Sequence, residues 1–185
     1  MTGTPATDAS PSPSIGLLEV AESLARGFSG TAPATTAALR RSVSTAYYAV
    51  FGTFVARAVK VMVPDATIEE GAKVSRVLSH QGLARAAVWV ERGQVNQLPE
   101  HLREAVAPMI TRASEQPAVV TVAIDFRALY GARLNVDYNP IAVADRVFAQ
   151  DQCRAARSMI EVIKSTDPPV SDAIDAWCRA VWLSR

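Results

Sequence analysis

The sequence predicts an all-α protein, folded as an up-and-down bundle of antiparallel helices. The clearest evidence is an apolar stripe in residues 43–62, where apolar residues recur at alternating steps of 3 and 1. Strand signals are nearly absent. Residues 119–122 have strand propensity, but no second strand is available to pair with them. Hydrophobic residues make up 49% of the 185-residue chain, which is enough for the core of one domain.

The first 62 residues predict a tail and two helices. Residues 1–14 are rich in Ser, Thr, Pro and Ala and carry no positive charge, which indicates a disordered tail rather than a signal peptide. A first helix follows over residues 14–28 and is stopped by Ser29-Gly30. The second and longest helix covers residues 33–62 and ends before Pro64.

The middle of the chain predicts shorter helices. Thr67 can cap a third helix, whose first turn is acidic and whose apolar stripe runs through Val74, Val77 and Leu78. A further helical piece lies between glycines at 82 and 93. Three prolines divide residues 94–117, leaving room for one helix from Glu100 to Arg112.

Three helices are predicted beyond residue 117. The first covers residues 118–138, and Asn139-Pro140 then has the pattern of an N-cap and first residue of a helix that runs to Lys164. Asp167-Pro168-Pro169 is a hinge before the last helix. We therefore expect a bundle over residues 15–165, with a C-terminal helix at 166–185 packed on it.

The charge and composition give little direct indication of a partner. The net charge is +1, so no global field attracts nucleic acid or a membrane, and no stretch of 18 apolar residues predicts a membrane span. Of the 19 basic residues only Lys60, Lys73 and Lys164 are lysines. Arginine suits planar contacts with phosphate or carboxylate, although the base composition of a GC-rich genome explains the same bias.

No residue pattern predicts a metal or a cofactor. Cys153 and Cys178 have neither metal-ligand spacing nor a disulfide framework, so we expect buried or half-buried thiols in a reducing cytoplasm. His80 and His101 are the two histidines, and neither has a metal-ligand spacing. His80 precedes Gly82 near an expected helix end, which favours a capping role for an imidazolium.

Two polar patterns could form a site. Arg41, Ser44 and Tyr48 follow one side of the long helix, beside the core stripe that contains Tyr47. As boundary residues these side chains need no function. As a site, Arg41 and Tyr48 would contact a phosphate and a base or carboxylate.

The second pattern lies at the end of the helix over residues 118–138. Arg133 and Asp137 are four residues apart and can pair on one helix face, and Tyr138 follows at the junction with the next helix. A structural ion pair with a capping tyrosine is the simpler interpretation. A ligand site is the alternative.

Together these stretches resemble the HEPN family of prokaryotic helical domains. Residues 41–51 (R-S-V-S-T-A-Y-Y-A-V-F) are similar to its R-x-S-x-x-A-Y-Y-A-x-F helix, and residues 133–140 (R-L-N-V-D-Y-N-P) to its R-x-x-A-D-Y-x-P motif. Residues 76–85, with His80 and Gly82, resemble a weaker intervening segment, R-x-L-x-H-x-x-L. The resemblance covers roughly residues 15–165.

The resemblance implies a four- or five-helix bundle that is commonly dimeric. Many members are metal-independent ribonucleases, often toxins paired with a nucleotidyltransferase-like antitoxin, and others bind nucleotides or RNA without cleavage. Active members place a histidine four to six residues after an arginine. Arg133 matches that arginine, but Tyr138 stands five residues later, and Gly52 stands where related members often carry a second histidine.

Three functions are therefore open. We expect a nucleotide- or RNA-binding module without efficient catalysis, of the kind found in toxin–antitoxin or defence loci with a partner protein. The ligand would lie where Arg41, Ser44 and Tyr48 meet Arg133, Asp137 and Tyr138. One alternative is a metal-independent ribonuclease that uses Arg133 with Tyr138, Asp137 or His80. Another is a structural helical oligomer.

A homodimer is also expected. Val88, Trp89 and Val90 are consecutive apolar residues, so their helix is apolar on more than one side. Trp177 and Trp182 on the last helix are further candidate anchors, because tryptophans are enriched at interfaces. Burial in a larger monomeric core is the alternative.

Overall fold

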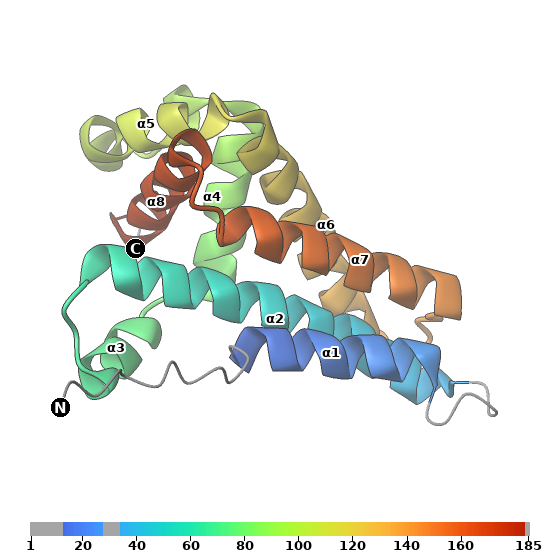
Figure 1. The fold of residues 1–185 in the computed structure, drawn as a ribbon. Coiled ribbons are helices and arrows are strands. Elements are labelled where there is room, and N and C mark those ends of the chain that lie inside the picture. Colours follow the sequence, from blue (N-terminus) through green and yellow to red (C-terminus); the bar gives the residue numbers. More distant parts are fainter. Residues whose placement is uncertain (1–12, 28–33, 184–185) are drawn as a thin grey trace, which may run out of the picture.

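The all-α prediction is confirmed by a computed structural model, which describes residues 13–27 and 34–183 (Figure 1). This part of the chain contains no strand. Its helices are α1 (Pro13–Arg26), α2 (Thr36–Met62), α3 (Ile68–Ser75), α4 (His80–Arg92), the short 3₁₀ helix η1 (Val95–Gln97), α5 (Glu100–Ser114), α6 (Pro117–Tyr138), α7 (Arg146–Ile163) and α8 (Pro168–Leu183).

Four helices, α1, α2, α6 and α7, form the up-and-down bundle (Figure 1). The Ser42 hydroxyl of α2 donates to the carbonyl of Ala21 in α1 at 2.8 Å and lies 3.4 Å from the sulfur of Cys153 in α7. Close to its start, α2 also contacts the end of α6, through a hydrogen bond from Arg40 to the carbonyl of Val136. The chain directions are seen in Figure 1: α2 is antiparallel to α1 and α6 and parallel to α7.

The remaining long helices, α4, α5 and α8, gather over the C-terminal half of α2 (Figure 1). Trp177 of α8 is fully buried, and its ring packs edge-on against Phe54 of α2, with 4.7 Å between ring centroids. Helix α8 therefore packs on the bundle helix α2.

Helix ends follow local capping chemistry. Thr67 forms a capping box with Glu70 at the start of α3, Ser79 caps α4 through the N–H of Gly82, and Asp145 caps α7 through the N–H of Phe148. Gly93 ends α4 in the left-handed conformation, with φ 59°, which glycine adopts without a steric penalty.

One predicted boundary is wrong. Asn139 is the C-cap of α6, because its backbone N–H donates to the carbonyl of Asn135, and it is not the N-cap of α7. Helix α7 begins only at Arg146, after a loop over residues 139–145. The side chain of Asn139 instead accepts from the N–H of Ile141, which stabilises a turn in that loop.

Other boundaries differ by small amounts. Helix α1 already begins at Pro13, so Ser14 is a buried helical residue and not part of the predicted tail. Residues 1–12 of that tail, and the predicted helix ends at Phe28 and Pro33, lie outside the described residues. Helix α3 ends at Ser75, so Val77 and Leu78 follow it.

The core contains most of the residues that the apolar stripes predict. Tyr47, Val50 and Phe54 of α2 are buried, whereas Phe51 is half-buried. Trp89 and Trp177, which the sequence offered as dimer anchors, are 6% and 0% exposed. Both tryptophans therefore belong to the core of one chain and provide no dimer surface.

Candidate functional site

The long helix α2 presents a mixed polar and aromatic face to α6. Ser44, Tyr47, Tyr48 and Phe51 follow one another at steps of 3, 1 and 3, so they share one side of the helix. Ser44 and Tyr47 are buried, while Tyr48 is 37% exposed. This face therefore runs from the core to the surface within one helix turn.

Arg133 of α6 lies against this face. Its Nη2 donates to the hydroxyl of Tyr48 at 2.8 Å, and its guanidinium carbon lies 5.5 Å from the centre of the Tyr48 ring and 5.3 Å from that of Tyr138. Both separations are within the range of cation–π attraction. The Arg133 side chain is only 12% exposed.

Asp137 of α6 links Arg133 to helix α2. One of its carboxylate oxygens, Oδ2, lies 2.8 Å from Nε of Arg133 and accepts a hydrogen bond from the Ser44 hydroxyl at 3.1 Å. The Nε–H of Arg133 is not aligned with the carboxylate, so this contact is an ion pair without a directed hydrogen bond. Asp137 thus fixes the position of the guanidinium while leaving it donors for other acceptors.

The charge on Arg133 is stabilised against its burial. Desolvation by burial opposes the cation, but the Tyr48 hydroxyl and the neighbouring Asp137 and Tyr138 outweigh it and raise the pKa of the guanidinium. Arg133 is therefore a fixed positive charge in a partly dry environment, where electrostatic interactions are stronger than in water.

His80, the first residue of α4, completes the Arg133 cluster. The other members of this cluster are Ser44, Tyr47, Tyr48, Arg133, Asp137 and Tyr138. Nδ1 of His80 lies 2.7 Å from the hydroxyl of Tyr47, and its ring lies over Phe51 with 3.9 Å between ring centroids. The ring is also edge-on to Tyr48, at 5.7 Å. His80 therefore packs on Tyr47 and Tyr48, the same two rings that Arg133 contacts.

The predicted role of His80 is wrong. It begins α4 instead of ending a helix, and the positive end of a helix dipole disfavours an imidazolium. Burial and the positive charge of Arg133 lower the pKa of His80 below 6.5, so the ring is neutral at pH 7. Burial also raises the pKa of Tyr47, which stays a protonated phenol.

Arg40 holds the end of α6 in place beside the cluster. Its Nε donates to the carbonyl of Val136 at 2.8 Å, and its Nη2 donates to the carbonyl of Asn139 at 3.1 Å. Nη2 also donates to the carbonyl of Val136, and Nη1 makes a longer hydrogen bond to the carbonyl of Pro140 at 3.4 Å. These carbonyls close the last turn of α6, which carries Asp137 and Tyr138.

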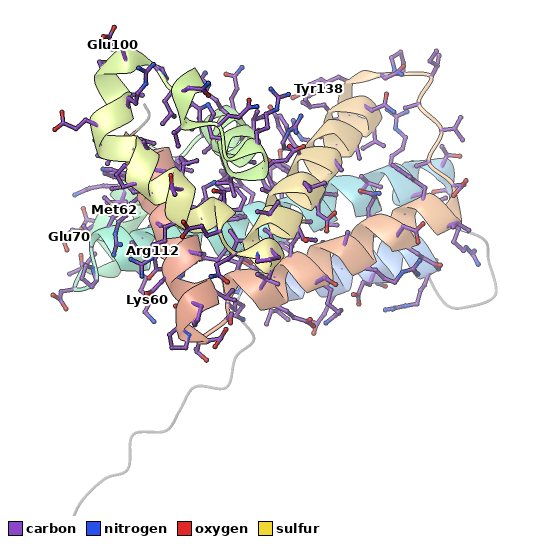
Figure 2. All side chains as sticks on the ribbon, turned by 90° about the horizontal axis from the view of Figure 1, so that it is seen from above. Lys60, Met62, Glu70, Glu100, Arg112 and Tyr138 are labelled. Carbon is purple, nitrogen blue, oxygen red and sulfur yellow. The ribbon has the colours of Figure 1, made fainter. Side chains whose placement is uncertain are left out.

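Five of the six residues proposed from the sequence lie together: Ser44, Tyr48, Arg133, Asp137 and Tyr138. The sixth, Arg41, is exposed, and its side chain has no hydrogen bond or ion pair with the described residues. Tyr138 is 70% exposed and projects from the end of α6 (Figure 2).

Sequence reasoning missed Arg40, and it named His80 only as one alternative partner of Arg133. Arg40 precedes Ser44, Tyr47 and Phe51 by 4, 7 and 11 residues, so helical periodicity alone puts it on the same face. The sequence signal for His80 is the resemblance of residues 76–85 to the R-x-L-x-H-x-x-L segment, whereas its exact position depends on how α4 crosses α2 and α6.

No protein-family model, curated protein or solved structure matches this chain. The resemblance to HEPN domains therefore stays a prediction from the motifs. In residues 13–27 and 34–183 no group of three His, Cys, Asp or Glu side chains is arranged to hold a metal ion. None of the helices in that part of the chain has the length and apolarity needed to cross a membrane.

Proposed function

We propose that the surface around Arg133 binds the phosphate and base of a nucleotide or of single-stranded RNA. The observation that supports this best is the placing of a mostly buried guanidinium between two partly exposed tyrosine rings, Tyr48 and Tyr138. Arginine donates to phosphate oxygens in a fixed planar geometry, and tyrosine rings stack on bases of any sequence. Arg133 would contact the phosphate, and Tyr138 would stack on the base.

A purely structural ion pair explains the arrangement less well. A structural role accounts for the pair between Arg133 and Asp137, which joins two turns of α6. It does not account for Tyr138, whose ring lies beside the guanidinium while 70% of the residue is exposed. An aromatic ring held at the surface beside a cation fits a binding face.

Fluorescence anisotropy with a labelled single-stranded RNA, competed by free nucleotides, tests the proposal. Arg133→Ala should weaken binding by roughly tenfold to a hundredfold, the loss expected for hydrogen bonds to a charged group. Arg112→Ala is the matched control, because Arg112 is an exposed arginine paired with Asp172 at 2.5 Å, far from Tyr138 in Figure 2. Equal losses in both variants would contradict a specific site.

The salt dependence gives a second criterion. Binding that rests on phosphate contacts weakens as salt rises, because bound counterions are released from the nucleic acid. Arg133→Lys keeps the charge but loses the planar fork, so it should retain the salt dependence while lowering the affinity. Binding that is insensitive to salt would contradict a phosphate contact.

Metal-independent RNA cleavage is a second candidate function, and His80 is the observation that favours it. A neutral imidazole beside Arg133 can accept the proton of a ribose 2′-hydroxyl as its oxygen attacks the phosphorus and displaces the 5′-oxygen of the next nucleotide. The products would be a 2′,3′-cyclic phosphate and a 5′-hydroxyl. Accepting this proton requires a free Nε2, so Nδ1–H would donate to Tyr47.

RNA incubated with the protein and a chelator separates the two functions. Cleavage that is lost in both His80→Gln and Arg133→Ala would establish the ribonuclease. Binding without cleavage would establish the module without catalysis. A chain that neither binds nor cleaves would leave the structural helical oligomer as the remaining function.

The proposed partners follow from the resemblance of the two motifs to HEPN domains. We infer a homodimer in the cytoplasm that acts with a partner protein encoded in the same toxin–antitoxin or defence locus. Cys153 and Cys178 are free and buried, which fits a reducing compartment. Co-expression with the product of the neighbouring gene, followed by co-purification, tests the partner.

A further inference from the structure

A second positively charged feature lies in a cavity near the C-terminal end of α2. The cavity has a volume of about 260 Å³ and opens between α2, the end of α7 and the linker to α8. Three of its lining residues are basic, and none of them is acidic. The lining residues are Thr53, Ala56, Arg57, Lys60, Ile163, Lys164 and Thr166.

The charge in this cavity is only partly compensated. Arg57 is held by α8, because its Nε lies 2.6 Å from a carboxylate oxygen of Asp175 and its Nη2 donates to the hydroxyl of Ser171 at 2.5 Å. Lys60 and Lys164 are exposed, and neither forms an ion pair with the residues that the structure describes. Two positive charges thus face the cavity without a carboxylate partner.

Helix dipoles explain part of this arrangement. Lys60 is in the last turn of α2 and Lys164 is the C-cap of α7, and a cation is favoured at each of these negative helix ends. The dipoles do not explain why lysines from two helices share one cavity. Nor do they explain why a chain rich in arginine places two of its three lysines there.

Lysine suits a small, compact anion. Its ammonium is a point charge with three rotatable donors, which can converge on a tetrahedral oxyanion, whereas the arginine fork favours planar pairs. The volume of about 260 Å³ is just below the roughly 300–1,000 Å³ of sites for drug-sized ligands. Ala56 and Ile163 are the apolar members of the lining.

We propose that this cavity binds a small free phosphorylated anion, of the size of phosphate or pyrophosphate, between Lys60 and Lys164. Arg57 forms the adjoining wall and adds positive charge. The site is independent of the Arg133 cluster. Arg57 follows Tyr48 by nine residues, which turns it to the opposite side of α2 by about 180°.

Calorimetric titration with pyrophosphate tests the site. The titrations are made in wild type and in an Arg133→Ala background, so that binding at the Arg133 cluster is removed. The pair Lys60→Gln and Lys164→Gln should weaken pyrophosphate binding at least about tenfold in the Arg133→Ala background, because each charge-assisted contact contributes that much. Lys73→Gln is the matched control, since Lys73 is the third lysine and pairs with Glu69 at 2.9 Å in α3.

Three results would contradict the proposed anion site, each for a different reason. No pyrophosphate binding in the Arg133→Ala chain, with circular dichroism showing an intact fold, would overturn the cavity as a site. A loss with Lys73→Gln as large as with the lysine pair would show attraction to surface charge only. A lysine pair that matters for a single-stranded oligonucleotide but not for pyrophosphate would overturn the assignment to a small anion.

Discussion

Arg133 carries its charge at the boundary between core and solvent. Its side chain is 12% exposed, while Tyr48 and Tyr138 beside it are 37% and 70% exposed. Much of the water around the guanidinium is thus already replaced by aromatic faces and by Asp137. If a phosphate binds here as proposed, less water would have to leave, so the arginine would be pre-organised for that anion.

His80 should make the stability of the fold depend on pH. Burial and Arg133 lower its pKa below the value of 6.5 in the unfolded chain. As pH falls below 6.5, the unfolded chain binds the proton before the folded chain does, so the free energy of unfolding decreases. Its contribution is fully present above the unfolded pKa. Urea unfolding between about pH 7 and pH 5 should show this loss.

The matched comparison uses the two histidines. His80→Gln should flatten the pH dependence, because glutamine does not titrate. His101→Gln should leave the pH dependence unchanged, since His101 is exposed on α5 away from the aromatic cluster. If the two variants give the same pH profile, His80 is not the source of the effect.

Arg40 should matter more than its neighbour Arg41. Arg40→Ala removes hydrogen bonds to the carbonyls of Val136 and Asn139, and we expect a loss of about 1.5–3 kcal/mol in unfolding free energy, the range for bonds to charged groups. Arg41→Ala should change stability by less than about 0.5 kcal/mol, as for an exposed residue without such contacts. Equal losses in urea unfolding would contradict the role of Arg40 as the clamp on α6.

At the scale of the element, the boundary between α6 and α7 shows how tertiary contacts override local signals. Asn139-Pro140 has the sequence of a helix start, yet the N–H of Asn139 continues the ladder of α6 and Arg40 binds its carbonyl. The chain therefore forms a loop from Asn139 to Asp145, the N-cap of α7. The side chain of Asp145 accepts a hydrogen bond from the N–H of Phe148 at 2.7 Å and caps the start of α7.

Substitution of this cap tests the revised boundary. Asp145→Ala should cost about 0.5–2 kcal/mol of unfolding free energy, because the N–H groups of the first turn lose their acceptor. Asp145→Ser keeps an acceptor and should cost much less. Urea denaturation of both variants gives the two values. A loss that is equal for Ala and Ser would show that the carboxylate acts through its charge rather than as a cap.

The helices and the two motifs could be predicted from the sequence, but the way they cross could not. The apolar stripe of α2 predicts which side faces the core, and the spacing of Arg133 and Asp137 predicts their pair. The contact between Ser44 and Asp137 could also be predicted, because short connections in a bundle impose antiparallel packing of neighbouring helices. His80 belongs to α4, and no local pattern predicts the angle at which α4 reaches Tyr47.

At the scale of the molecule, α2 separates two regions of positive charge. One side carries Tyr48 against Arg133 of α6, and the other carries Arg57 beside the end of α7. In Figure 2 the labelled Tyr138 and Lys60 accordingly lie far apart. A net charge of +1 is compatible with these local cations, because Asp137 pairs with Arg133 and Asp175 with Arg57, and further acids lie elsewhere in the chain.

The predicted homodimer requires an apolar surface outside the core, and the loop between α6 and α7 with the first turn of α7 has exposed apolar side chains that would provide one. Ile141 is 84% exposed, Val143 is 82% exposed and Val147 is 66% exposed, next to Tyr138. Exposed apolar groups that lie together mark association sites, and two copies related by a two-fold axis would cover the same segment in each other. This segment replaces the buried Trp89 and Trp177 as the expected interface, and Trp182 is half-buried.

Sedimentation at tens of micromolar should therefore give about twice the chain mass of 19.8 kDa. Combining Ile141→Asp with Val143→Asp should give the monomer, because two copies would bring four carboxylates together in an apolar contact. Ile124→Asp is the control, since Ile124 is 46% exposed on α6 but lies fourteen residues, or about 21 Å, before Tyr138. A monomeric wild type would refute the dimer. A dimer that survives the paired substitution but is lost with Ile124→Asp would move the interface to the N-terminal half of α6.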